Sequence, residues 1–224
     1  MTIAVGFHCK DGLVLAADRQ FTAPGTFKYH AKKFATNTQG FSELAYVFAG
    51  YPGVFAEMQQ KVDALLTQEP MEVISPAFIK DTIEGVLVGM GWKENFLEGR
   101  LCFLLAINEL FEPPQMLVFD ETSLCWANTG IRVIGCGDTS LIRYLGDRLH
   151  SPEMPINEGV GLGAYLIKKA TQYIDYCGEP IDVLVINESG IREAKREEVT
   201  ASIQKMESQE DFLSTLLVQT PFQL

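Results

Sequence analysis

The apolar residues of this chain change their spacing several times, and the resulting order of strand-like and helix-like segments restricts the fold most strongly. Apolar runs at residues 3–9 and 13–18 stand on either side of an Asp-Gly pair, which is typical of a β-hairpin turn. Further strand-like runs follow at about 33–37 and 44–49, the latter almost wholly apolar. The chain is therefore predicted to begin with antiparallel strands.

After residue 50, pairs of helices alternate with groups of strands. The first pair has apolar residues at helical spacing, and Pro52 and Ser75 stand where the two helices would begin. Asn157 is the expected N-cap of the last helix of the second pair, and a charged tail over about 196–224 has a weak helical pattern. Helices are predicted over about 52–66, 76–90, 138–149 and 157–175, and strands over about 101–108, 115–120, 124–128, 131–135, 181–187 and 191–193.

This order favours a single α+β domain over residues 1–224. Clustered hairpins indicate antiparallel sheets rather than alternating βαβ units. Two sheets with apolar faces can bury one face against each other and the other face under helices. The predicted fold is therefore a four-layer α/β/β/α sandwich of two antiparallel sheets flanked by helix pairs.

The charge balance narrows the choice of partners. The chain has 18 Lys and Arg against 29 Asp and Glu, a formal net charge of −11. Such an acidic chain repels phosphate backbones, so nucleic acid is not expected as a partner. No apolar run approaches the roughly 18 residues of a membrane span and no secretory signal is recognised, so no membrane partner is expected.

The cysteines and histidines have no metal-binding pattern. No C-x-x-C pair occurs and the three histidines lack ligand spacing, so no metal site is expected. Free thiols in a reducing cytoplasm are the simplest interpretation of the scattered cysteines. The residues concerned are Cys9, Cys102, Cys125, Cys136 and Cys177, with His8, His30 and His150.

Thr2 directly follows the initiator methionine. Removal of Met1 by an aminopeptidase would leave Thr2 with a free α-amine beside its own hydroxyl. Such an amine has an ordinary pKa of roughly 7.7–8.0, so much of it could accept a proton near neutral pH. A threonine activated by its own amine is a known nucleophile. Threonine at this position is also common in proteins that are not hydrolases.

Several dispersed motifs make the nucleophile hypothesis more specific. The chain contains T-x-x-V-G from residue 2, K-D-G from 10, L-A-A-D from 15, Thr22, K-K-F from 32 and A-G at 49–50. In order and spacing they resemble the proteasome β-subunit family, which includes bacterial proteasome-like peptidases and belongs to the N-terminal nucleophile hydrolases. Weaker similarity continues through V-I-G-C-G at 133–137 and C-G-E-P-I-D-V at 177–183. The resemblance implies the same sandwich fold.

The resemblance also implies a role for four residues. Thr2 would be the nucleophile, with its α-amine as proton acceptor. Lys33 would polarise the hydroxyl, and Asp18 would pair with Lys33 and keep it charged. The backbone N–H of Gly50 would stabilise the oxyanion. One residue fewer than usual separates Asp18 from Lys33, so Lys32 competes for the lysine role.

The sequence departs from the family pattern at two motifs. Cys136 stands where the family usually has the serine of G-S-G. In the D-x-x-S-G motif, Cys177 replaces the serine and Ile174 takes the aspartate position, with Asp175 one residue away. Either these cysteines pack as small apolar residues, or Cys136 and Cys177 face each other near Thr2 and gate the site by oxidation.

A substrate pocket is implied beside the nucleophile. Two phenylalanines would make it apolar and shallow, although both could equally be ordinary core residues. Thr22 would offer backbone groups to an extended substrate. The positions implied by the resemblance are Phe21, Thr22, Ala31, Ala35, Phe48 and Pro52.

The leading interpretation is a threonine endopeptidase that cleaves peptides or unfolded proteins inside a self-compartmentalising ring of like or unlike subunits. It would need no cofactor. An ATP-dependent unfoldase is a conceivable partner, but no G-x-x-x-x-G-K-[ST] motif occurs in this chain. Two alternatives are a catalytically inactive ring subunit and an N-terminal nucleophile amidase acting on small amides.

Overall fold

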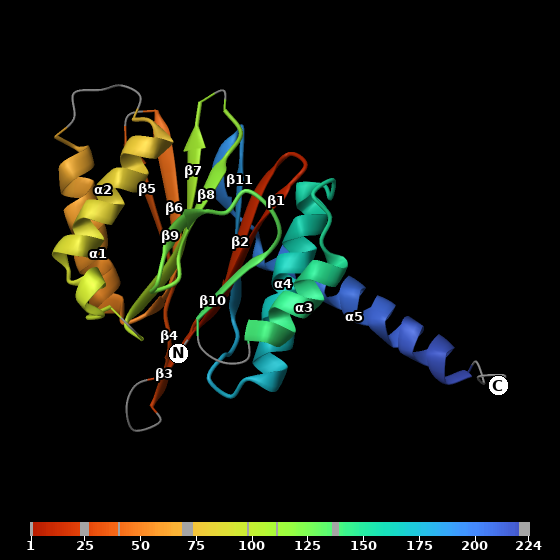
Figure 1. Ribbon diagram of the computed structural model, residues 1–224. Coiled ribbons are helices and arrows are strands. Elements are labelled where there is room, and N and C mark those ends of the chain that lie inside the picture. Colours follow the sequence, from red (N-terminus) through yellow and green to blue (C-terminus); the bar gives the residue numbers. More distant parts are fainter. Residues whose placement is uncertain are drawn as a thin grey trace.

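In the computed structural model, the described residues are 2–22, 27–39, 41–68, 74–97, 99–110, 112–135 and 139–219, with side chains as far as residue 211. They form two five-stranded antiparallel sheets and five α-helices, so the predicted mixed fold with antiparallel sheets is confirmed (Figure 1).

The first sheet has the strand order β10-β1-β2-β11-β12. Its central strands are buried along nearly their whole length, because the sheet is covered on both faces. The tight connection between β1 and β2 is the predicted Asp-Gly turn, with Cys9 paired to Gly12. The bounds are β1 Ile3–Cys9, β2 Gly12–Asp18, β10 Arg132–Gly135, β11 Ile181–Asn187 and β12 Gly190–Glu193.

The second sheet runs in chain order, β5-β6-β7-β8-β9, as an antiparallel meander. Strands β6 and β7 pair over nine positions, from Ser42 opposite Glu109 to Gly50 opposite Leu101. The bounds are β5 Phe34–Gln39, β6 Ser42–Gly50, β7 Leu101–Glu109, β8 Gln115–Phe119 and β9 Leu124–Trp126.

A separate pair of short strands, β3 (Gln20–Thr22) and β4 (Lys28–His30), interrupts the path between the two sheets. The sequence predicts no strand between the runs at 13–18 and about 33–37, so this pair was missed. The strands are too short to show an alternating pattern, and β4 is exposed along its length.

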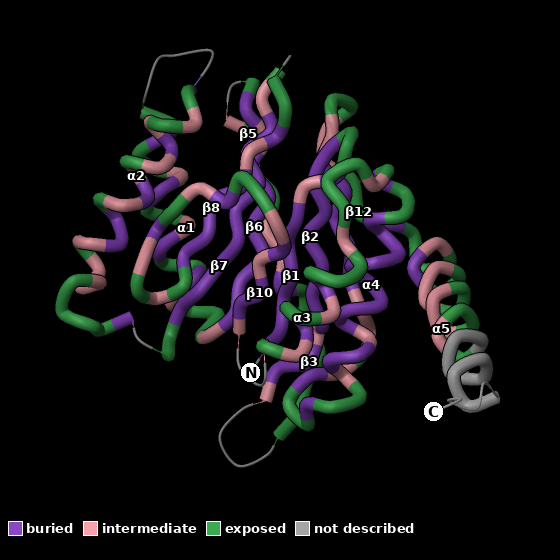
Figure 2. The backbone as a smooth tube through the Cα atoms, turned by 45° about the vertical axis from the view of Figure 1, so that its right-hand side comes forward, coloured by how far each residue is buried: buried purple, intermediate pink, exposed green. Residues whose placement is uncertain are grey.

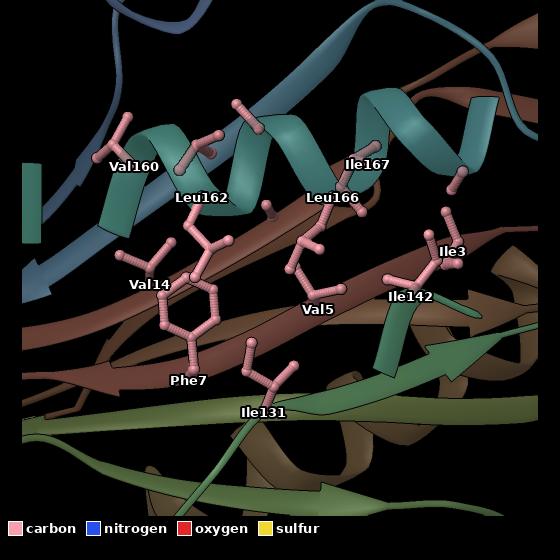
Figure 3. Packing of buried hydrophobic residues seen from close by; sticks show 14 of the residues in the cluster. Ile3, Val5, Phe7, Val14, Ile131, Ile142, Val160, Leu162, Leu166 and Ile167 are labelled. Carbon is pink, nitrogen blue, oxygen red and sulfur yellow. The ribbon is translucent and has the colours of Figure 1, made fainter. Parts of the chain in front are cut away.

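Three clusters of buried side chains account for the packing. One joins the two sheets and includes Ala17 and Leu104. A second lies between the β5–β9 sheet and the helices α1 (Pro52–Leu66) and α2 (Pro76–Gly89). The third lies between the other sheet and the helices α3 (Thr139–Leu149), α4 (Ile156–Tyr173) and α5 (Arg196–Gln219). In this cluster Phe7 and Val14 meet Leu162 (Figure 3). Figure 2 shows the buried strands of both sheets between these helices.

The helices α1 (Pro52–Leu66) and α2 (Pro76–Gly89) begin where expected, and Ser75 Oγ accepts a hydrogen bond from the Phe78 N–H at 3.3 Å. After a short 3₁₀ turn η1 (Trp92–Glu94), the second group comprises α3 (Thr139–Leu149), α4 (Ile156–Tyr173) and α5 (Arg196–Gln219).

The prediction that Asn157 caps α4 is wrong. The N-cap is Pro155, whose side chain makes no capping bond. The Asp11 carboxylate, from the β1–β2 turn, accepts the Ile156 N–H at 2.8 Å instead. A cap from a residue 145 positions away leaves no local sequence signal.

Candidate active site

Asp18 and Lys33 form an ion pair that is completely buried. Asp18 ends β2, Lys33 stands one residue before β5, and both side chains have 0% of their surface exposed. The Lys33 Nζ lies 2.7 Å from Asp18 Oδ1 and donates to the Gln20 carbonyl oxygen at 2.5 Å. The ring of Phe21 lies 4.7 Å from the same ammonium. These partners offset the desolvation cost of burying the charged lysine away from water.

The Asp18 carboxylate also receives three backbone N–H groups. Its Oδ1 accepts from Ile3 at 3.0 Å, and its Oδ2 accepts from Gln20 at 3.1 Å and Gly178 at 3.2 Å. The bond from Ile3 is the important one for the site, because Ile3 follows Thr2 directly. The carboxylate that holds Lys33 therefore also holds the chain segment that carries Thr2.

Thr2 is 1% exposed and stands one residue before β1. Gly135, at the end of β10, pairs with Ile3 and comes very close to the Thr2 backbone. A Cβ at Gly135 would lie 2.0 Å from the Thr2 carbonyl oxygen, and its φ of +115° also disfavours other residues. Gly135 therefore permits the close packing that fixes Thr2 beside the first sheet.

Gly50 ends β6 with a φ of +112°, and a Cβ there would lie 2.2 Å from the Arg100 carbonyl oxygen. Along an antiparallel strand, alternate N–H groups point to the same edge. The Phe48 N–H donates to the Lys33 carbonyl at 3.1 Å. The Gly50 N–H, two residues later, is therefore directed toward the edge on which the segment carrying Lys33 lies.

The neighbouring lysine lies elsewhere. Lys32 is exposed, and its Nζ lies 2.5 Å from Glu193. The geometry therefore brings Lys33, and not Lys32, to Asp18.

The positions implied for a substrate pocket divide into core and surface. Phe48 stacks on Phe55 with ring centroids 4.1 Å apart, and Phe21 lies 6.2 Å from Phe48. Both Phe21 and Phe48 are only 5% exposed, so they pack as core residues while forming one apolar wall near Lys33. Thr22 and Ala35 are half-buried, and Ala31 and Pro52 are exposed.

The loop that replaces the D-x-x-S-G motif contacts Asp18 through its backbone. Gly178 supplies the N–H described above, and a Cβ at Gly178 would lie 2.3 Å from Gln20 Oε1. The Asp175 carbonyl oxygen accepts from Gln20 Nε2 at 3.4 Å and from Lys28 Nζ at 2.9 Å. Sequence analysis did not identify Gln20 as part of the site, since a glutamine two residues after an aspartate carries no distinctive signal.

Of the two cysteines at the altered motifs, Cys177 lies among the described residues and Cys136 does not. Cys177 is buried and packs in the cluster that includes Ile3 and Ile174. Cys136 lies outside the described residues, and so does any contact between these two thiols.

Among the described residues, no group of three or more His, Cys, Asp or Glu side chains could hold a metal ion. Within the same part of the chain, no helix is long and apolar enough to span a membrane.

Comparison with known proteins identifies relatives of two kinds. No protein-family model matches the chain. The proteasome subunit beta of Methanosarcina barkeri is 29% identical over 204 residues, covering 88% of this chain and 92% of that protein. The proteasome subunit alpha of Methanococcus maripaludis is 25% identical over 193 residues, covering 84% and 71% respectively.

The solved structures similar to this chain include Anbu proteins. Anbu (ancestral beta-subunit) from Yersinia bercovieri aligns with a TM-score of 0.80, 14% identity and 98% coverage of both chains. A helical assembly of the Anbu complex from Pseudomonas aeruginosa aligns with a TM-score of 0.72, 16% identity and 96% coverage of both. The predicted resemblance to the proteasome β-subunit family is therefore confirmed, and the chain has the Anbu fold.

Proposed function

We propose that this relative of the proteasome subunits is a threonine peptidase whose nucleophile is Thr2 after removal of Met1. The observation that carries the proposal is the buried Asp18–Lys33 pair bonded to the segment that bears Thr2. A fully buried ammonium is costly to place and does not strengthen a fold by itself. Its link to the N-terminal segment through the Asp18 carboxylate is accounted for by a role in polarising the threonine.

The proposed reaction is acyl transfer followed by hydrolysis. The Thr2 hydroxyl attacks the peptide carbonyl while the Thr2 α-amine takes up the hydroxyl proton. The Gly50 N–H donates to the oxyanion of the tetrahedral intermediate. The amine then protonates the departing amino group, leaving an ester on Thr2. A water molecule, deprotonated by the same amine, hydrolyses that ester.

Lys33 has an electrostatic role in this scheme. Its positive charge favours the partly negative threonine oxygen and lowers the tendency of the neighbouring α-amine to hold a proton. Asp18 keeps Lys33 charged and in place. The apolar wall of Phe21 and Phe48 would favour apolar side chains next to the cleaved bond, with Ala31, Ala35 and Pro52 around it.

The larger organisation is also part of the proposal. We infer that the helix and sheet layers form the α/β/β/α sandwich of the N-terminal nucleophile hydrolases, and that the chain assembles with copies or relatives of itself. The helical assembly of the Pseudomonas aeruginosa Anbu complex supports assembly. Tyr51, the N-cap residue of α1, is 55% exposed, and Leu65, on α1, is 46% exposed, so both suit a subunit contact. Peptides or unfolded proteins would be the substrates, with an unfoldase as an optional partner in the cytoplasm.

The test begins with the intact mass of the purified protein, which is expected to lack Met1. Thr2→Ala should abolish cleavage of a fluorogenic peptide panel, and Thr2→Ser should retain part of it. Thr38→Ala, an exposed threonine on β5, is the matched control and should leave turnover unchanged. If Met1 is retained, or if Thr2→Ala turns over normally, the nucleophile assignment is wrong and the inactive ring subunit is favoured. Turnover of small amides without peptide cleavage would favour the amidase.

A further inference from the structure

Arg19 and Lys32 flank the buried pair in the sequence and meet on the carboxylate of Glu193. Arg19 follows Asp18, and Lys32 precedes Lys33. The Arg19 guanidinium and the Lys32 ammonium both reach Glu193, and the guanidinium also binds Asp182. Two acidic residues from β11 and β12 therefore hold the direct neighbours of both members of the pair.

Of the contacts among Arg19, Lys32, Asp182 and Glu193, the one between Arg19 and Asp182 has two hydrogen bonds and is the most buried. The Arg19 Nε and Nη2 donate to the two Asp182 oxygens at 2.6 Å and 2.5 Å, which is a bidentate arrangement. Asp182 is only 5% exposed, so its charge needs this partner. The same carboxylate raises the pKa of Arg19, mainly through the hydrogen bonds.

The contacts of Glu193 are more exposed. Its Oε1 lies 3.4 Å from Arg19 Nη2 and its Oε2 lies 2.5 Å from Lys32 Nζ, while 41% of its side chain is exposed. Glu193 thus bridges the two basic residues, and it connects the segment before Lys33 with the segment after Asp18.

Main-chain hydrogen bonds also tie residue 19 to two other segments of the chain. The Arg19 N–H donates to the Pro180 carbonyl at 3.0 Å, and the Arg19 carbonyl accepts the Ala31 N–H at 3.0 Å. Residue 19 therefore lies between the chain entering β11 and the chain leading to Lys33. A shift of its side chain would be passed to the backbone on both sides.

We propose that Asp182 and Glu193 are positioning residues that set the placement of Lys33 and Asp18 relative to Thr2. They do not touch the substrate; they act through Arg19 and Lys32. This proposal rests on the proposed function, because it gives the pair a catalytic task. A misplacement of about 1 Å in a catalytic group can lower turnover by roughly 10²-fold.

The test compares Asp182→Asn with Glu198→Gln. Glu198 makes the same type of contact, a two-point pair with Arg192 at 3.1 Å and 3.2 Å, and serves as a matched control outside the site. For Asp182→Asn we expect kcat to fall about tenfold with KM within about twofold, since binding groups are untouched. Removing a negative charge also disfavours nearby cations, so the acidic limb of the kcat–pH profile should move to lower pH. Asp182→Glu should restore the limb, because it restores the charge.

A second readout does not depend on turnover. Lys33 should be acetylated faster by acetic anhydride in Asp182→Asn than in the parent protein, as measured by peptide mass spectrometry. Glu193→Gln, at an exposed position that folding tolerates, should show a smaller increase in the same direction. Equal kcat–pH profiles and equal Lys33 acetylation in Asp182→Asn, Glu193→Gln and the Glu198→Gln control would overturn the positioning role. Faster acetylation in a protein whose Thr2→Ala variant turns over normally would instead overturn the proposed function alone.

Discussion

Replacement of Asp18 by Asn should destabilise the protein strongly, although it changes one atom. The carboxylate receives two donors on each oxygen: Ile3 and Lys33 on Oδ1, and Gln20 and Gly178 on Oδ2. An asparagine has one acceptor oxygen, so in either orientation two donors lose their acceptor. A buried donor without a partner costs about 1–3 kcal/mol.

The loss of the Asp18 negative charge gives a larger estimate of the destabilisation than the lost hydrogen bonds do. Lys33 is completely buried, and removal of one partner of a buried ion pair typically costs about 3–5 kcal/mol. The hydrogen-bond and charge contributions overlap, so about 3–5 kcal/mol is expected in total. With a slope of about 2 kcal/mol per molar urea, the unfolding midpoint should fall by about 2 M.

Two further variants make this result interpretable. Asp120→Asn is the matched control, because all four donors of Asp120, from Thr122 and Ser123, use the single oxygen Oδ1. An asparagine oxygen can replace it, so a change within about 0.5 kcal/mol is expected. Lys33→Met removes the buried charge, and combining it with Asp18→Asn should cost less than the sum of the two single changes.

Urea denaturation followed by circular dichroism measures the parent protein, the three single variants and the double variant. A loss below about 1 kcal/mol for Asp18→Asn, or full additivity with Lys33→Met, would show that the ion pair is not as dry or as coupled as the geometry indicates.

Three other predictions concern stability. Gly135→Ala should lower the free energy of unfolding by more than about 3 kcal/mol and disturb Thr2, since the added Cβ meets the Thr2 carbonyl oxygen at 2.0 Å. Gly85→Ala, in α2 with nothing within 4 Å of the added Cβ, should raise the free energy of unfolding in urea by about 0.5–1 kcal/mol. A stabilised Gly135→Ala together with a destabilised Gly85→Ala would refute this. Ser75→Ala should cost about 1 kcal/mol by loss of the α2 cap, detected as a lower melting temperature. Burial lowers the pKa of His8 below its ordinary 6.5, so its contribution is present above pH 6.5 and is lost as pH falls through the lower folded value. The free energy of unfolding should therefore fall on acidification, and less so in His8→Gln; an equal fall in both proteins would contradict the assignment.

Local signals in the sequence were enough for most elements of the fold. The Asp-Gly turn, the helical spacing from Pro52 onward and the long apolar strands depend on residues close together in the chain, and each was predicted near its observed place. Short or distant features were not accessible in this way. The β3–β4 pair has three residues per strand, and the cap of α4 comes from Asp11.

The candidate site likewise has features that the local sequence indicates and features that depend on distant residues. The sequence by itself determined which residue types are present for the proposed chemistry: a threonine behind the initiator methionine, an aspartate and two adjacent lysines, and a glycine after a buried strand. The resemblance favoured Lys33 for the lysine role and kept Lys32 as a competitor, because one residue fewer than usual separates Asp18 from Lys33.

Only the tertiary structure decided which of the two lysines pairs with Asp18, by burying Lys33 against that carboxylate and placing Lys32 on Glu193. It also decided that Gly178, 160 positions from Asp18, supplies one of the four donors to that carboxylate. Composition and periodicity act over a few residues, whereas hydrogen bonds and ion pairs depend on distances in space. Which charges are dry, and which partners satisfy them, is therefore fixed only when the sheets and loops have packed.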